Sequence, residues 1–433
     1  MKLLTFQTTA LVLLLIVFPN KTWGCEQFAN GDNYEERHIR MPTWDHGITF
    51  QSEEPSNSQD FDVMSFGATG DGVTDDTQAF TDAWAAACKV DHAHLIVPRN
   101  RSFLVGPTTF SGPCSRLSMR VEGTIVAPPS PNYWRGFSTD TWLVFSLLDS
   151  FTLEGDGIID GQGQEWWAQS CKVNKSNPCH AAPTAVTIST SNNTRVRDLT
   201  FTNSQQMHLI FDECIKVHAS DLLVTAPEKS PNTDGIHVHA SSDVLITDCI
   251  IGTGDDCISI QTDTFDTRIK NVICGPGHGI SIGSLGKGGS FSNVSHLIVD
   301  GAILNGTTNG LRIKSWQGGQ GAANDIQFQN VRMINVSNPI IIDQYYCDSR
   351  VPCQNQTSAV EVSEITYKNI IGTSSTATAI KFACSDTVAC HDILLQNVNL
   401  VMHKTLHPAT SFCENAKGST RGFINPISCL AEI

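Results

Sequence analysis

A pattern of short β-forming segments, each interrupted by asparagine or aspartate, recurs from about Thr184 almost to the end of the chain. The interrupting residues are Asp198, Asp221, Asp248, Asn271, Asp300, Asn330, Asn369 and Asn397. They lie 23 to 39 residues apart, and no segment between them keeps a 3.6-residue apolar period over three turns. Repeats of this length made only of strands predict an all-β fold, a right-handed parallel β-helix. We expect stacked Asn, Ile and Val to fill its interior.

A β-sandwich is the alternative, because it also contains many short strands. A sandwich would need hairpin turns between neighbouring strands. The near-periodic Asn and Asp do not require such turns, so the pattern favours the β-helix.

The segment from Phe61 to Cys88 predicts a short helix that caps the first coil. Thr74 and Asp75 are candidate N-cap residues. The apolar residues that follow share one helical face and are Phe80, Ala83, Trp84 and Ala87. Such a cap is expected because an exposed first coil invites pairing with other chains.

The N-terminus predicts export from the cell. Lys2 is followed by an apolar run over 10–18, which is too short to span a bilayer, and Gly24 precedes a plausible cleavage point. We therefore expect a signal peptide over 1–24, an irregular polar arm over 25–60, and one catalytic β-helix domain over 61–433. The expected location is extracellular, in the cell wall, with no membrane attachment after cleavage.

The cysteines agree with an oxidising compartment. Of the 15 Cys, ten lie in close pairs: Cys171/Cys179, Cys257/Cys274, Cys347/Cys353, Cys384/Cys390 and Cys413/Cys429. A zinc site is disfavoured because no CxxC pair occurs. The count is odd, and Cys214 and Cys249 are expected to be small buried hydrophobic residues inside strands. Sequons for N-glycosylation begin at Asn100, Asn174, Asn192, Asn293, Asn305, Asn335 and Asn355.

The charge balance limits the partners. The chain has 28 Lys+Arg against 43 Asp+Glu, which gives a net charge of −15. Such a chain is a poor candidate for binding nucleic acid or anionic membranes. An acidic polymer substrate would need a local basic patch.

Four clusters of polar residues recur at about the spacing of one coil. They contain Asn232 and Asp234, Asp255 and Asp256, His278, and the cations Arg312 and Lys314. Neighbouring strands lie about 4.8 Å apart, so equivalent positions on successive coils meet on one wall. These residues are therefore expected to converge in a groove, where mutual repulsion raises the pKa of at least one carboxyl. Glycoside cleavage needs that combination of one protonated and one ionised carboxyl.

Strand alternation gives finer expectations. In Arg312-Ile313-Lys314, both cations should point outward while Ile313 enters the core. Strict alternation would bury Asp256 without a partner, which is costly, so the strand should begin or bulge near Gly254. His237 and His239 are expected to be exposed on a strand. Trp166 and Trp167 are expected to be structural, whereas Trp316 fits either a buried anchor or a sugar-stacking role.

These four motifs closely resemble those of the polygalacturonases of glycoside hydrolase family 28, as in its plant members. The resemblance implies an inverting hydrolase of α-1,4-linked galacturonic acid that needs no metal or other cofactor. It implies that Asp255 is the general acid, that Asp234 and Asp256 activate water, and that His278 supports the acid. It also implies substrate-binding roles for Asn232, Arg312, Lys314 and Tyr346. The expected partner is polygalacturonic acid or pectin.

Three other readings stay open from the sequence. A pectate lyase would use calcium held by clustered Asp, but Gly277-His278-Gly279 and Arg312-Ile313-Lys314 would then have no role. A rhamnogalacturonan hydrolase is chemically closer, and a non-catalytic wall-binding β-helix is the third possibility. We expect a monomer, because a capped β-helix needs no partner. The choice between internal and terminal cleavage is not fixed by the sequence, and a plant-like segment over 157–167 favours internal cleavage.

Overall fold

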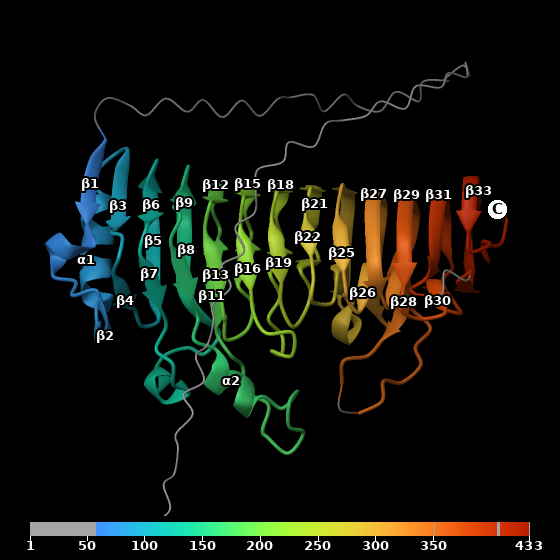
Figure 1. The fold of residues 1–433 in the computed structure, drawn as a ribbon, viewed down its shortest axis with the longest axis horizontal. Coiled ribbons are helices and arrows are strands. Elements are labelled where there is room, and N and C mark those ends of the chain that lie inside the picture. Colours follow the sequence, from blue (N-terminus) through green and yellow to red (C-terminus); the bar gives the residue numbers. More distant parts are fainter. Residues whose placement is uncertain (1–57, 350, 405–407, 433) are drawn as a thin grey trace, which may run out of the picture. The chain divides into compact units, whose positions relative to one another are not determined.

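The computed structural model describes residues 58–349, 351–404 and 408–432. The predicted signal peptide and the arm as far as residue 57 lie outside the described residues. The first described strand begins at Gln59, two residues before the predicted start of the β-helix domain. Within the part of the chain that the structure describes, 33 strands follow one another in a single stack of coils (Figure 1).

The strands stack in three parallel columns, called sheets 1 to 3 below; sheets 1 and 2 join at β27 (Gln320–Val336), which pairs with both β24 (Phe291–Asp300) and β25 (Ile303–Asn305). Sheet 1 contains β1 (Gln59–Asp62), β3 (Ala93–Val97), β6 (Ser118–Val121), β9 (Thr152–Glu154), β12 (Asn192–Arg197), β15 (Ile215–Ser220), β18 (Ser242–Thr247), β21 (Thr264–Lys270), β24 (Phe291–Asp300), β27 (Gln320–Val336), β29 (Glu361–Ser374), β31 (Cys390–Met402) and β33 (Ala416–Asn425). Sheet 2 contains β2 (Asp71–Asp75), β4 (Ser102–Leu104), β7 (Thr124–Val126), β10 (Ile158–Asp160), β13 (Thr200–Thr202), β16 (Leu223–Thr225), β19 (Ile250–Gly252), β22 (Ile273–Cys274) and β25 (Ile303–Asn305). Sheet 3 contains β5 (Thr108–Ser115), β8 (Thr141–Asp149), β11 (Thr184–Ser189), β14 (Leu209–Asp212), β17 (Ile236–His239), β20 (Ile258–Ile260), β23 (Ile280–Leu285), β26 (Asn309–Trp316), β28 (Asn338–Tyr346), β30 (Thr378–Ala383) and β32 (Thr410–Glu414).

Each strand pairs in parallel with its equivalents on the coils before and after it. The strand β20, for example, pairs in parallel with β17 on one side and with β23 on the other. This pairing confirms the predicted parallel β-helix and excludes the sandwich, whose sheets are antiparallel.

The interior consists of columns of apolar side chains at matching positions of successive coils. One column in sheet 1 is made of buried Val196, Ala219, Ile246, Ile269, Val299, Phe328, Tyr367 and Leu395. The rings of Phe328 and Tyr367 stack with centroids 5.1 Å apart. Because each coil covers the apolar face of its neighbour, the core runs continuously along the stack.

The recurring Asn and Asp lie outside the interior, so that part of the prediction is wrong: four directly follow a strand of sheet 1, and the other four lie within β24, β27, β29 and β31. Seven of the eight adopt a left-handed conformation, such as Asn330 at φ 57° and Asn369 at φ 55°. Asn tolerates this conformation better than most residues. The side chains bond from coil to coil: Asn369 donates to Asn330 (3.0 Å), and Asn397 donates to Asn369 (3.2 Å). These residues therefore recur once per coil, as predicted, but they form a ladder of side chains outside the core.

Helix α1 (Thr77–Ala87) caps the first coils, as predicted. Its buried face includes Phe80 and Trp84, and the Trp84 ring packs on Phe110 and Phe145. The N-cap residue is Asp76 rather than Thr74 or Asp75, which end strand β2. Thr74 and Asp75 continue the extended chain of that strand, and the helix begins only after it.

Three short 3-10 helices and a second, short α-helix lie among the loops of the described chain. They are η1 (Val63–Phe66), η2 (Pro131–Trp134), η3 (Lys287–Gly289) and α2 (Gln164–Gln169), of which η1 follows the first strand. Trp166 and Trp167 of α2 are buried, which agrees with the structural role expected for them. None of the helices that the structure describes has the length and apolar character needed to cross a membrane.

All five close cysteine pairs form disulfides. A sixth disulfide joins Cys88, next to the end of α1, to Cys114 in β5, and the sequence analysis did not identify it. Cys214 and Cys249 are free and buried. They lie in the short turns between strands, not inside strands as expected, where their small side chains still fill the interior.

Candidate active site

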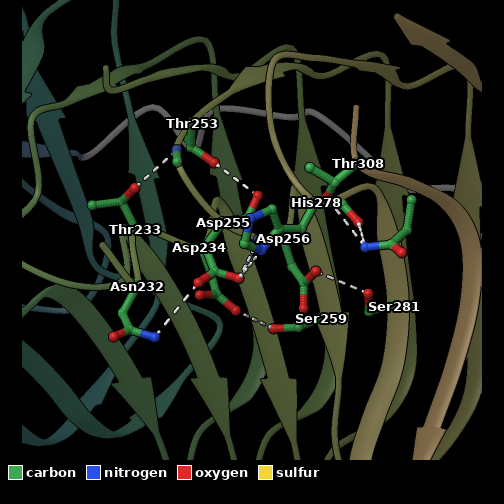
Figure 2. Close-up of polar contacts among 12 residues, drawn as sticks. Asn232, Thr233, Asp234, Thr253, Asp255, Asp256, Ser259, His278, Ser281 and Thr308 are labelled. Atoms are coloured by element: carbon green, nitrogen blue, oxygen red, sulfur yellow. Dashed lines mark hydrogen bonds and ion pairs between the residues drawn. The ribbon is translucent and has the colours of Figure 1, made fainter. Parts of the chain in front are cut away.

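The predicted site residues gather where neighbouring strands of sheet 3 begin. Asp234, Asp256 and His278 stand two residues before the paired Ile236, Ile258 and Ile280 on three neighbouring strands. Asp255 directly precedes Asp256, and Arg312 and Lys314 follow on the next strand, β26. Figure 2 shows the carboxyl groups of Asp234, Asp255 and Asp256 facing a common space beside His278. The convergence that the coil spacing predicted is therefore present.

The turn that carries Asp255 and Asp256 is held tightly. Strand β20 begins only at Ile258, so the pair precedes the strand, which agrees with the expected break near Gly254. A Cβ at Gly254 would lie 2.0 Å from the carbonyl oxygen of Ser230, so only glycine fits there. The disulfide between Cys257 and Cys274 ties the end of the turn to the same coil.

The loop of His278 also depends on glycine. Gly277 and Gly279 adopt φ values of 150° and 89°, and a Cβ on Gly279 would lie 2.2 Å from the carbonyl oxygen of Asn309. The backbone N–H of His278 donates to the carbonyl of Asp255 (2.7 Å). A Cβ on Gly277 would lie 2.7 Å from the carbonyl oxygen of Asp255, so Gly277 allows the His278 loop to approach the Asp255 turn, and Gly279 allows it to approach the next coil.

Asp256 is a buried carboxylate held by two cations. Its exposed fraction is 1%, and its Oδ1 accepts hydrogen bonds from Arg312 Nη2 (2.6 Å) and Ser281 Oγ (2.9 Å), while Lys314 Nζ donates to Oδ2 (2.8 Å). Burial alone raises the pKa of Asp256, but the charges of Arg312 and Lys314 outweigh burial and hold the pKa below its ordinary value. Asp256 is therefore ionised in the folded protein across the mildly acidic range.

Asp234 lies in the opposite electrostatic situation. Burial, followed by the nearby charges of Asp255 and Asp256, raises its pKa well above the ordinary value. Its Oδ2 accepts one hydrogen bond from Ser259 Oγ (2.9 Å). Asp234 is therefore the carboxyl whose pKa is raised, first by burial and further by the crowding that the sequence predicted.

Asp255 is joined to the histidine. Its Oδ1 lies 2.9 Å from His278 Nδ1 and accepts the backbone N–H of Asp256 (2.9 Å). Its Oδ2 has a longer contact with Asn232 Nδ2 (3.5 Å). The side chain of Asp255 is more exposed than those of the other two aspartates, at 18%. It is therefore the carboxyl of the three that a molecule entering from solvent meets most readily.

The two cations lie on the side of β26 opposite Ile313, as alternation predicted, but they do not form a free basic patch. Both are paired with Asp256, and the side chain of Lys314 is only 9% exposed. Lys314 Nζ also lies 5.3 Å from the ring centroid of Tyr346, which contacts the ring of Trp316 edge to face. The sequence placed these cations correctly and did not reveal their carboxylate partner.

A row of polar residues beside the aspartates joins Arg312 to His237 and to two serines that sequence reasoning did not single out. His237, Ser259, Ser281 and Arg312 occupy matching positions on β17, β20, β23 and β26. His237 is not exposed as expected: its Nδ1 lies 2.6 Å from Ser259 Oγ, and burial lowers its pKa to about 4. Aligning Ile236, Ile258 and Ile280 would have found the first three, whereas Arg312 follows Leu311, which takes the place of the isoleucine on β26. His239 is partly exposed and pairs with Asp212 (2.6 Å).

Asp255, Asp256 and His278 also form the arrangement nearest to a metal site among the described residues, with ligand atoms within 4.8 Å of one another. The donor set suits a cation poorly, because both oxygens of Asp256 already accept bonds from positively charged groups. A metal ion at this position would face Arg312 and Lys314 directly. The arrangement fits proton transfer between carboxyl groups better than metal ligation.

Comparison with known proteins agrees with the geometry. Residues 88–429 match the family model of glycosyl hydrolases family 28. A polygalacturonase of Persea americana is 52% identical over 349 residues, which cover 80% of this chain and 75% of that protein. A probable polygalacturonase of Arabidopsis thaliana is 49% identical over 384 residues, covering 88% of this chain and 86% of that protein.

Solved structures show the same fold. The polygalacturonase of Erwinia carotovora ssp. carotovora superimposes with a TM-score of 0.67 at 24% identity, covering 89% of this chain and 99% of that one. An endo-xylogalacturonan hydrolase of Aspergillus tubingensis gives a TM-score of 0.69 at 20% identity, covering 84% and 100%. The carboxylate cluster, the β-helix and these similarities lead to one conclusion: the chain belongs to glycosyl hydrolases family 28 and is a glycosidase.

Proposed function

We propose that this protein is a secreted polygalacturonase that hydrolyses internal α-1,4-galacturonosyl linkages of pectin with inversion at the anomeric carbon. The observation that carries the proposal is the cluster of Asp234, Asp255 and Asp256, in which the accessible Asp255 bonds to His278 while the buried Asp256 is held ionised by Arg312 and Lys314. The relatives named polygalacturonase support the substrate class. The signal peptide over 1–24, the arm over 25–60, the extracellular location and the monomeric state remain part of this proposal.

Asp255 serves as the general acid in the proposed mechanism. It is the most exposed of the three aspartates and can give a proton to the glycosidic oxygen of the leaving sugar. The hydrogen bond to His278 fixes its orientation and offers a second position for the proton. Asn232 lies beside its other oxygen and is placed to contact the sugar.

Asp256 serves as the base that takes a proton from the attacking water. A base must be ionised, and Arg312 and Lys314 keep Asp256 in that form despite its burial. Asp234, with its raised pKa, holds a proton and orients the same water. Water then attacks the anomeric carbon as the bond to the leaving oxygen breaks, which inverts the configuration.

The experiment that tests the proposal follows the first-formed product by proton NMR. Demethylated polygalacturonic acid is incubated with the protein, and new reducing ends are expected to appear as the β-anomer before mutarotation. Solution viscosity should fall faster than reducing ends accumulate, because internal bonds are cut. A first-formed α-anomer would contradict inversion, and viscosity that falls only in proportion to reducing ends would contradict internal cleavage.

A further inference from the structure

A cleft that is lined in part by lysines lies near the carboxylate cluster. We call it the basic cleft; its volume is about 1060 Å³, and its lining includes Lys172, Lys175, Lys287, Trp316, Gln317 and Asp348. This size is typical of a ligand-binding cleft. None of the catalytic carboxyls lines it, so the basic cleft is separate from the space between Asp255 and Asp256.

Two disulfide-closed loops from distant parts of the chain form its walls. One loop follows α2 and is closed by Cys171–Cys179, and the other follows β28 and is closed by Cys347–Cys353. Lys172 contacts the carboxylate of Asp348, so a salt bridge joins the loops directly beside both disulfides. The loops are therefore held against each other, and the cleft between them is shaped by covalent and ionic links.

The cleft is positively charged in a protein of net charge −15. Lys172 neutralises Asp348, which leaves Lys175 and Lys287 as exposed cations in the lining. In the described parts of the chain, neither of these two lysines forms an ion pair with a carboxylate. Lys287 Nζ lies 5.6 Å from the ring centroid of Trp316, and this cation–π contact holds the lysine at the cleft wall.

A chain of contacts connects the basic cleft to the catalytic carboxylates. Trp316 lines the cleft and touches Tyr346, with ring centroids 5.6 Å apart. Tyr346 lies over Lys314 Nζ, which bonds to Asp256 (2.8 Å). A sugar chain that passes Asp256 toward Tyr346 therefore meets the cleft next.

We propose that the basic cleft is an additional binding subsite for anionic sugar, in which Lys175 and Lys287 bind carboxylates of galacturonate units beyond the two that flank the cleaved bond. This inference rests on the proposed function and extends it. It predicts that the protein prefers long, demethylated stretches, because methyl esterification removes the charge that the lysines recognise. Trp316 acts as a positioning residue for Lys287.

The test measures the binding of hexagalacturonate by calorimetry. Every protein variant in it carries Asp255→Asn, which prevents turnover. In that background, Lys175→Ala with Lys287→Ala should raise the Kd about tenfold and make binding less sensitive to added salt. Lys175→Arg with Lys287→Arg should keep the Kd within about threefold, because the charge is retained. Lys417→Ala, an exposed lysine of β33 far along the stack, is the matched control and should change nothing.

The outcomes separate the subsite from the proposed function. An unchanged Kd in the double alanine variant would overturn the subsite, as would an equal loss in the double arginine variant. If the wild-type chain releases no reducing ends but hexagalacturonate binding still depends on the two lysines, the hydrolase proposal fails and the subsite stands. If the wild-type chain does not cleave polygalacturonic acid and the Asp255→Asn chain does not bind hexagalacturonate, both fail.

Discussion

Asp256 shows how a buried charge is retained at the residue scale. Removing a carboxylate from water is costly, and an unpaired one would become protonated. Here two cations and the hydroxyl of Ser281 bond to it, so the charged form survives at 1% exposure. Arg312 and Lys314 therefore affect the chemical step through Asp256, in addition to any contact with the sugar carboxylate that the motif implies.

Lys314→Met is expected to change the pH dependence of hydrolysis. Without Lys314, burial outweighs the remaining attraction of Arg312, the pKa of Asp256 rises, and the base is lost at higher pH than in the wild type. The acidic limb of the kcat/KM profile should move upward by roughly one pH unit or more. Lys417→Met serves as the control. A rise in KM alone, with an unmoved acidic limb, would show that Lys314 acts only on substrate binding.

His208 is fully buried and arranged for its neutral form. Its Nδ1 lies 3.0 Å from the carbonyl oxygen of Asp234, which can only accept, and its Nε2 receives the backbone N–H of Ser204 (3.4 Å). Nδ1 therefore carries the proton, and a second proton on Nε2 would face a donor. Burial lowers the pKa of His208 to about 4.

This arrangement predicts a loss of stability in acid. Between the ordinary pKa of 6.5 and about 4, the unfolded chain binds a proton at His208 that the folded protein does not. Thermal stability should therefore fall as the pH decreases through this window, by roughly 3 kcal/mol at most for this group. His208→Gln should reduce that slope. His239→Gln is the control with the opposite sign, because Asp212 raises the pKa of His239. An unchanged slope in His208→Gln would contradict this explanation.

The residue scale also shows what the sequence could predict. The aspartates, His278 and the two cations were found because their spacing matches one coil. Their partners were not found, because hydrogen bonding depends on side-chain direction in turns such as Gly254–Cys257, where strand alternation does not apply. His237 was placed on the surface because alternation gives it the outer face of β17, and that face becomes covered only when Ser259 and Asp234 are brought beside it.

At the scale of single elements, the ladder of Asn and Asp side chains links neighbouring coils outside the core. Asn369 illustrates it, since it combines a left-handed backbone with hydrogen bonds to Asn330 and Asn397. The repeat predicted that such residues recur once per coil. It did not predict that they lie outside the core, because residues inside and outside the core recur with the same period.

Asn369→Ala is expected to destabilise the protein more than Asn369→Gly. Both variants lose the ladder hydrogen bonds, but only alanine must also hold a left-handed conformation, which costs roughly 1–2 kcal/mol for a residue with a Cβ. The midpoints of thermal unfolding measure the difference. If the alanine variant is as stable as the glycine variant, the left-handed backbone conformation does not explain why asparagine stands at this position.

On the scale of the whole molecule, the β-helix brings together residues that are far apart in sequence. Asp234 and Lys314 meet because four strands stack in register, whereas Lys172 and Asp348 meet because two long loops reach the same cleft. The first kind of contact could be predicted from coil spacing. The second kind of contact could not be predicted, because the paths of loops do not follow the repeat of the coils. The same holds for the disulfide between Cys88 and Cys114.

The most direct test of the central claim is the release of reducing ends from demethylated polygalacturonic acid at mildly acidic pH, with a calcium chelator present. We expect the wild type to release reducing ends without unsaturated, ultraviolet-absorbing products, and Asp255→Asn to lose at least about 99% of that rate while still binding the polymer. Loss of wild-type activity in chelator, or unsaturated products once calcium is restored, would contradict hydrolysis by the carboxylate cluster. Full activity in Asp255→Asn would contradict its role as the acid.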